Sequence, residues 1–81
     1  MELLENAVYL LTAAAELTAE GSNFNVCHEE LTGLLNRVYK KIPNLEIDTE
    51  IIDMFKKSLA ADVFSAGTVN TAIIMLRFVL Q

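Results

Sequence analysis

The sequence predicts an all-α protein, a compact antiparallel four-helix bundle. Apolar residues recur at three- and four-residue spacing over long stretches, and short turn-forming segments separate these stretches. Nowhere do apolar and polar residues alternate strictly, as they do in a half-buried strand. The expected helices cover residues 2–20, 26–41, 49–61 and 66–80. Because the connections between them are short, we expect consecutive helices to pack antiparallel in one domain spanning residues 1–81.

The first expected helix carries a broad apolar stripe made of two adjacent rows of residues. One row contains Leu4, Val8, Leu11, Ala15 and Thr18, and the other contains Leu3, Ala7, Leu10, Ala14 and Leu17. Its small alanine side chains let another helix approach closely. Tyr9 lies at the edge of the stripe, where its ring can be covered while its hydroxyl faces water. Gly21 is expected to end the helix in the left-handed conformation.

The second expected helix begins after a turn and ends before Pro43, which cannot continue it. Either Asn23 or Asn25 can cap its first turn. Glu29-Glu30 at its start and Lys40-Lys41 at its end suit the helix dipole. The expected buried face consists of Cys27, Leu31, Leu34, Leu35, Val38 and Ile42.

The third expected helix has the clearest start in the chain. Asp48 is expected to cap it, with Ile47 and Ile52 in the positions of a hydrophobic staple. The basic pair Lys56-Lys57 falls near its end, where the helix dipole favours positive charge. Its expected buried face consists of Ile51 or Ile52, Phe55 and Leu59.

The fourth expected helix is apolar on nearly every side, a pattern typical of a central or an interface helix. Ser65 can cap a helix that starts at Ala66, and Thr68 can cap one that starts at Val69. These residues and Gly67 favour a break after the third helix over one long continuous helix. The expected inner face consists of Val69, Ala72, Ile73, Leu76 and Leu80, and other faces carry Ile74, Phe78 and Val79.

The composition indicates a partner. The chain has 81 residues, of which 53% are hydrophobic and only 21% are charged. A domain near this length buries only about 60–65% of the surface that its unfolded chain exposes. Much of the apolar surface must therefore face water or another molecule, and we expect a protein partner, either a second copy as a homo-oligomer or a different protein.

The charge argues against two other kinds of partner. The net charge of −5 does not suit nucleic acid or an anionic membrane, which both need clustered positive charge. Glu2 and Glu5 stand where a secretory leader is positive. The apolar run 72–80 carries Arg77 and is too short to span a bilayer. We therefore expect a cytoplasmic protein without a transmembrane segment.

Only one short motif invites a chemical interpretation. Cys27-His28-Glu29 begins like the metalloprotease helix motif, but the second histidine is replaced by Thr32. Adjacent residues on a helix point about 100° apart, so Cys27 and His28 do not face one metal ion or one substrate. The favoured interpretation is a core cysteine beside a surface histidine. We expect no catalytic residue, no metal, no cofactor and no small-molecule ligand.

Large apolar side chains outside the expected core form the candidate partner interface. Phe24, Val63 and Phe64 lie in or beside turns, where each can either plug an end of the bundle or anchor a partner. The complete candidate set is Phe24, Val63, Phe64, Ile74, Phe78 and Val79.

These observations favour a non-enzymatic protein–protein interaction module that self-associates or docks on another protein. The helix order and the segment Leu45-Glu46-Ile47-Asp48 also resemble the small bacteriocin immunity proteins, which are antiparallel four-helix bundles of about this length. That resemblance implies an inhibitor or immunity-type binding protein. A second alternative is a helix-turn-helix regulator, in which the last helix would present Asn70 to a base edge.

Overall fold

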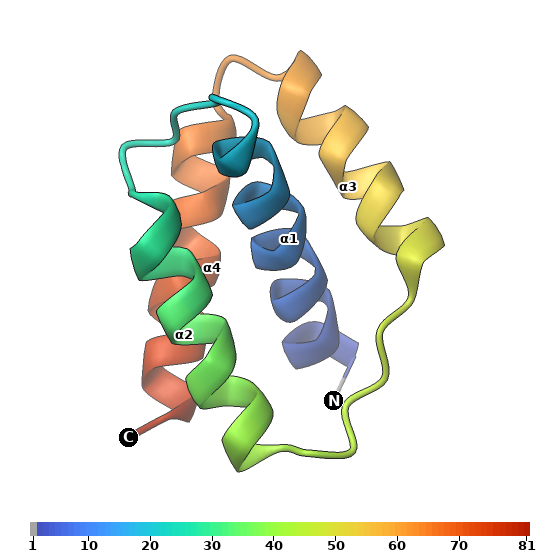
Figure 1. Cartoon of the computed structure of the whole chain (residues 1–81), viewed down its shortest axis with the longest axis vertical. Helices are drawn as coiled ribbons and strands as arrows, with labels where there is room; N and C mark the ends of the chain where they lie inside the picture. The colour runs from blue at the N-terminus through green and yellow to red at the C-terminus, as the bar shows by residue number, and fades with distance from the viewer. Residues whose placement is uncertain (1) are drawn as a thin grey trace.

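The computed structural model describes residues 2–81, and over this range the chain forms four helices and no strand. The helices are α1 (Glu2–Ala19), α2 (His28–Lys41), α3 (Thr49–Ala61) and α4 (Ser65–Val79). Consecutive helices run in opposite directions (Figure 1). The predicted all-α four-helix fold is confirmed, and every helix end lies within two residues of its predicted position.

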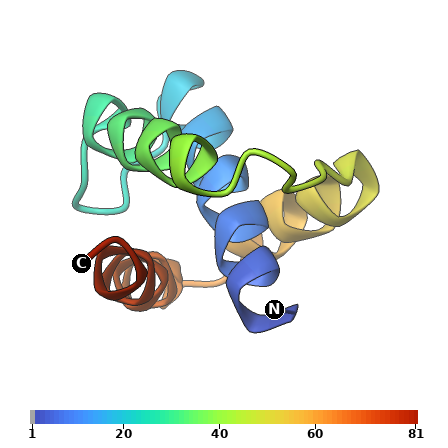
Figure 2. The same cartoon turned by 90° about the horizontal axis from the view of Figure 1, so that it is seen from below.

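The central element is α1. It packs against each of the other three helices, with α3 on one side and α2 and α4 on the other (Figure 2). Val8, Leu11, Ala13 and Ala14 of α1 are completely buried. The apolar pattern of the last helix was consistent with either a central helix or an interface helix. In the structure the central helix is α1. The reason is that its alanines let neighbouring helices approach closely from several sides.

The core contains most of the residues that the helical spacing selected. The predicted inner rows of α2 and α4 are buried from Leu31 to Val38 and from Val69 to Leu76. In α3, Ile52 and Leu59 are buried and Phe55 is partly buried. Leu3 and Cys27 are exceptions, because both are exposed at the first turn of a helix or just before it. Ile42, at the end of the predicted α2 face, is only half-buried.

The end of α1 forms as predicted. Gly21 has a φ of +106°, the left-handed conformation that a residue without a Cβ adopts most easily. The N–H of Ser22 donates to the carbonyl of Leu17 at 2.9 Å, and the N–H of Gly21 donates to Thr18 at 3.1 Å. This pair of hydrogen bonds is a Schellman motif, which satisfies carbonyls left open at the helix end.

The predicted asparagine cap of α2 is wrong. The helix begins at His28, and Cys27 occupies the N-cap position without a capping hydrogen bond from its side chain. Asn23 Oδ1 accepts instead from the N–H of Asn25 at 2.8 Å, and Asn25 has a positive φ of 62°. The asparagine side chain thus stabilises the preceding turn, a local use that competes with helix capping. This later start moves Cys27 out of the predicted core face.

Asp48 caps α3 as predicted. Its Oδ1 accepts hydrogen bonds from the N–H groups of Glu50 at 3.1 Å and Ile51 at 3.3 Å. Of the two staple residues, Ile52 is buried but Ile47 is mostly exposed. The cap therefore rests on the carboxylate more than on an apolar contact.

The predicted break between the last two helices is confirmed, but neither predicted hydroxyl caps α4. The helix begins at Ser65, which is buried within its first turn, and Phe64 holds the N-cap position. Asp62 Oδ1 accepts from the N–H of Phe64 at 2.8 Å and fixes the turn.

Across residues 2–81, no helix has both the length and the apolar character needed to cross a membrane.

Candidate docking surface

The structure separates the six predicted interface residues into three places. Phe24 is only 7% exposed and packs in the core, which favours the plug over the partner anchor as its role. It plugs the end of the bundle because the turn after α1 folds back over the helices. Val63 and Phe64 lie on the turn between α3 and α4 (Figure 1). Further along α4 lie Ile74, Phe78 and Val79.

An apolar hollow of about 460 Å³ lies between the start of α1 and the outer side of α4. Leu3 at 70% exposure and Phe78 at 74% exposure are the most exposed of its apolar side chains. Ile74 is also exposed, and Val79 is half-buried. The hollow is lined by Leu3, Leu4, Ile74, Met75, Phe78 and Val79, and we call this set the α1/α4 face.

A second apolar hollow, of about 340 Å³, adjoins the first and shares Leu3 and Met75 with it. Its floor is α1 and its walls are α3 and α4, because α3 packs chiefly against α1 and leaves a groove towards α4. Ala7 and Ala72 line it with small side chains. The two hollows together form a mostly apolar surface that spans α1, α3 and α4.

Leu3, Leu4 and Met75 were not predicted as part of the interface. The 3.6-residue period placed Leu3 and Leu4 in the core rows of the first helix. Only the position of Leu3 in the first turn, where no neighbouring helix covers it, distinguishes it from the buried residues of the same row. A periodic pattern identifies a shared face but not where the neighbouring helix ends.

The α4 side of the α1/α4 face carries little charge. From Ser65 to Gln81 the sequence contains no acidic residue and a single basic one, Arg77. Arg77 forms an exposed ion pair with Glu30 of α2 at 3.6 Å. A neutral surface of this kind attracts an apolar partner without electrostatic steering.

The turn between α3 and α4 forms a separate, smaller apolar surface. Val63 is 88% exposed and Phe64 is 77% exposed. This turn lies at one end of the molecule, and the C-terminal end of α4 lies at the other (Figure 1). Val63 and Phe64 therefore cannot form one patch with Phe78.

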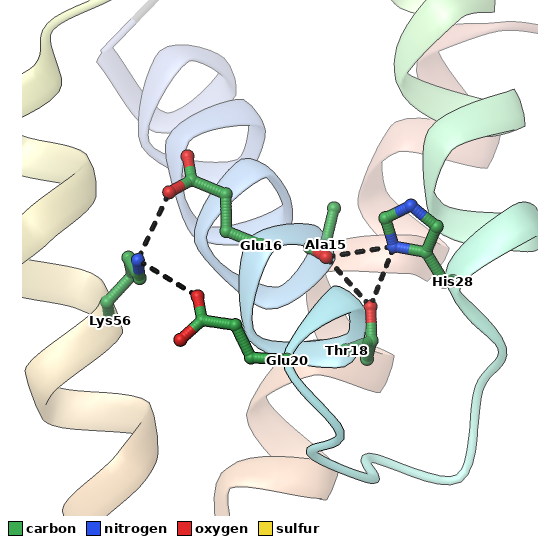
Figure 3. Close-up of polar contacts among 6 residues, drawn as sticks. All are labelled: Ala15, Glu16, Thr18, Glu20, His28 and Lys56. Carbon is green, nitrogen blue, oxygen red and sulfur yellow. Dashed lines mark hydrogen bonds and ion pairs between the residues drawn. The ribbon is translucent and has the colours of Figure 1, made fainter.

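The Cys27-His28 pair has a structural role on the α2 side. The prediction of a buried cysteine is wrong, since Cys27 is exposed. His28 Nδ1 lies 2.9 Å from the Ala15 carbonyl oxygen and 3.1 Å from Thr18 Oγ1 (Figure 3). A carbonyl oxygen only accepts, so the contact places the proton on Nδ1, which donates to α1. Over residues 2–81, no three His, Cys, Asp or Glu side chains gather closely enough to hold a metal ion.

Lys56 joins α3 to α1 rather than serving the dipole of its own helix. Its Nζ lies 3.2 Å from Glu16 and 3.4 Å from Glu20 (Figure 3). Hydrogen bonds to these two carboxylates raise the pKa of Lys56 above its usual value. The helix-dipole interpretation is wrong for Lys56-Lys57, because both lie before the last turn of α3. It holds for Lys40-Lys41, which lie in the last turn of α2.

Tyr9 differs from the prediction of a water-facing hydroxyl. The residue is buried, and its hydroxyl donates to the carbonyl of Glu46 at 2.9 Å. The bond fixes the connection between α2 and α3 onto α1. Burial raises the pKa of Tyr9, and the nearby carboxylates, Glu5 first among them, raise it further.

Comparisons of this chain with protein-family models, with curated proteins and with solved structures found no match. The resemblance to bacteriocin immunity proteins therefore stays a prediction. What the chain does has to be inferred from its surfaces.

Proposed function

We propose that this protein is a non-enzymatic protein–protein interaction module that docks through the α1/α4 face. The observation that carries the proposal is the exposure of Leu3, Ile74 and Phe78 around one apolar hollow. Contiguous apolar patches on small proteins commonly mark interaction sites. Burying a Phe or Leu side chain contributes about 1.5–3 kcal/mol, so a few such side chains suffice to anchor a partner.

The arrangement of the polar residues supports an interaction role. His28 bonds to the backbone of α1, Lys56 bonds to carboxylates of α1, and the Tyr9 hydroxyl bonds to a carbonyl. These side chains join helices to one another. The apolar hollows, by contrast, are lined by side chains that offer contact area rather than acid–base chemistry.

A helix-turn-helix regulator is less well supported than a protein-binding module. Its recognition helix would be α4, whose one cation, Arg77, pairs with Glu30. Binding to the DNA backbone depends on several phosphate contacts from Lys and Arg. We therefore expect no retention on heparin at low salt, and retention that falls steeply with added salt would favour the regulator.

The proposal is tested by photo-crosslinking from a single position in cells that express the full chain. A photoreactive amino acid replaces Phe78 in one variant and Phe64 in a matched control. Both phenylalanines are about three-quarters exposed, so the two variants differ mainly in the surface they probe. We expect discrete adducts from position 78 and few or none from position 64.

The masses of the adducts identify the docking surface and the partner. An adduct of two 9.0 kDa chains indicates self-association, and a heavier discrete adduct indicates a different protein. Either result at position 78 supports the proposal. No discrete adduct at position 78, or stronger adducts at position 64, would contradict it.

A further inference from the structure

We infer that the occupant of the α1/α4 face is a second copy of this chain, with the α4 helices of the two copies packed antiparallel about a two-fold axis at Ile74. The inference rests on the proposed function, because it uses Ile74 and Phe78 of the same face and names the partner that covers them. A two-fold interface brings the same patch of both copies together, so the patch must be complementary to itself.

The exposed side of α4 has the spacing that such packing needs. Residues three, four and seven positions before and after Ile74 lie on one side of a helix. All of them are exposed. Gln81 lies beyond the end of α4, so the stripe on the helix consists of Gly67, Asn70, Thr71, Ile74, Arg77 and Phe78.

The stripe is complementary to itself in size. Its N-terminal half carries small side chains, and its C-terminal half carries large ones. In an antiparallel pair centred on Ile74, Phe78 of one copy lies opposite Asn70 of the other. Nothing lies within 4 Å of the place where a Cβ of Gly67 would stand, so that part of the stripe is open. Large side chains therefore meet small ones across the axis.

The stripe brings no like charges together across the axis. Arg77 of one copy lies opposite Thr71 of the other, so the two arginines do not meet across the axis. Each chain carries a net charge of −5, yet α4 contributes no carboxylate. When two copies meet through α4, the surfaces in contact carry no acidic residue, although each chain is acidic overall. A strongly basic partner would instead be attracted to the acidic surfaces of the other helices.

The small size of the face indicates a weak dimer. A standard interface buries about 800 Å² per partner, which is about 15% of the 5181 Å² surface of this chain, and uses about 20–30 residues a side. The stripe and its apolar neighbours Leu3, Leu4, Met75 and Val79 form a smaller set. We therefore expect a dimer that dissociates on dilution in the micromolar range.

The test uses opposite charges placed at the proposed axis. Ile74→Glu and Ile74→Lys are purified separately and mixed in equal amounts, and sedimentation velocity measures the mass of each sample and of the wild type. We expect a wild-type dimer. Each variant alone should dimerise on the order of 100-fold more weakly, because two apolar contacts are lost and like charges meet at the axis.

The equimolar mixture should regain a dimer, because each heterodimer pairs a glutamate with a lysine across the axis. Met54→Glu is the matched control, since Met54 is also exposed and apolar but lies on α3. It should leave the dimer unchanged. Circular dichroism checks that every variant keeps its helix content. If either Ile74 variant loses helix content, Phe78→Lys replaces it and should weaken the dimer at least about tenfold.

A wild type that stays monomeric at the highest concentration would overturn the inference, and so would a dimer that Ile74→Glu leaves unchanged. If each Ile74 variant alone is monomeric and the equimolar mixture forms no heterodimer, the axis at Ile74 is also overturned. These failures are distinguishable from a failure of the proposed function. Crosslinks from position 78 to a different protein would preserve the docking surface while excluding the second copy as its occupant.

Discussion

Asp48 illustrates how one side chain fixes the start of a helix. Its carboxylate accepts from two N–H groups that have no partner within the helix. Asp48→Ala should lower the free energy of unfolding by about 1 kcal/mol, the usual cost of losing such a cap. Urea denaturation measures the loss. Asp53→Ala is the control, because Asp53 is exposed within the same helix. Equal losses in the two variants would show that the cap has no special role.

Tyr9 makes the stability of the fold sensitive to alkaline pH. Burial and neighbouring carboxylates raise its pKa above the ordinary value of 10.0. A raised folded-state pKa gives stability that is present below pH 10 and is lost as the pH rises through the folded-state value. We expect the wild type to lose more stability than Tyr9→Phe as the pH rises from 9 to above 10. Urea midpoints measured across this range check the prediction, and parallel losses in the two proteins would contradict it.

At the scale of single residues, the sequence predicted Asp48 and Gly21 correctly because each acts through its own backbone neighbourhood. It failed for Asn23, whose side chain can bond either within the turn or to the first turn of the next helix. It failed for Cys27 as a consequence, because its position relative to the helix depends on that choice. Asn23 stabilises the turn, the helix starts later, and Cys27 becomes exposed. Pattern alone does not rank these two competing hydrogen bonds.

At the scale of helices, the alanines of α1 determine how closely its neighbours approach. Ala14 is completely buried, and interiors are packed without spare volume. Ala14→Leu should therefore destabilise the protein by about 1–3 kcal/mol through overpacking, although leucine is a good helix former. Thermal or urea unfolding measures the change. Ala60→Leu on the exposed side of α3 is the matched control and should change stability little. Similar values for both variants would contradict the central role of α1.

The sequence predicted where each helix lies but not which helix is central. The last helix is apolar on nearly every side, a pattern that suits either a buried helix or an interface helix. In the structure its inner side, including Val69 and Leu76, is buried, while Ile74 and Phe78 remain exposed. The ambiguity arises because helical spacing records which residues share a side of the helix and does not record what covers that side.

At the scale of the whole molecule, the surplus of apolar residues predicted from composition appears as a located surface. Most of the apolar side chains fill the core around α1, and most of the exposed ones lie on the α1/α4 face and on the turn at Val63 and Phe64. Composition predicted that such a surface exists. The spacing within the last helix selected its α4 side, with Ile74, Phe78 and Val79. Its α1 side could not be predicted, because it depends on where the neighbouring helices leave the start of α1 uncovered.

The central claim is that a second copy covers the α1/α4 face in solution. The most direct test is covalent footprinting of the wild type at low and at high protein concentration, read out residue by residue. Phe78 and Phe64 are about equally exposed in one chain and serve as each other's control. We predict that the labelling of Phe78 falls as concentration rises while that of Phe64 stays constant. Constant labelling of Phe78, or a fall at Phe64 instead, would contradict the claim.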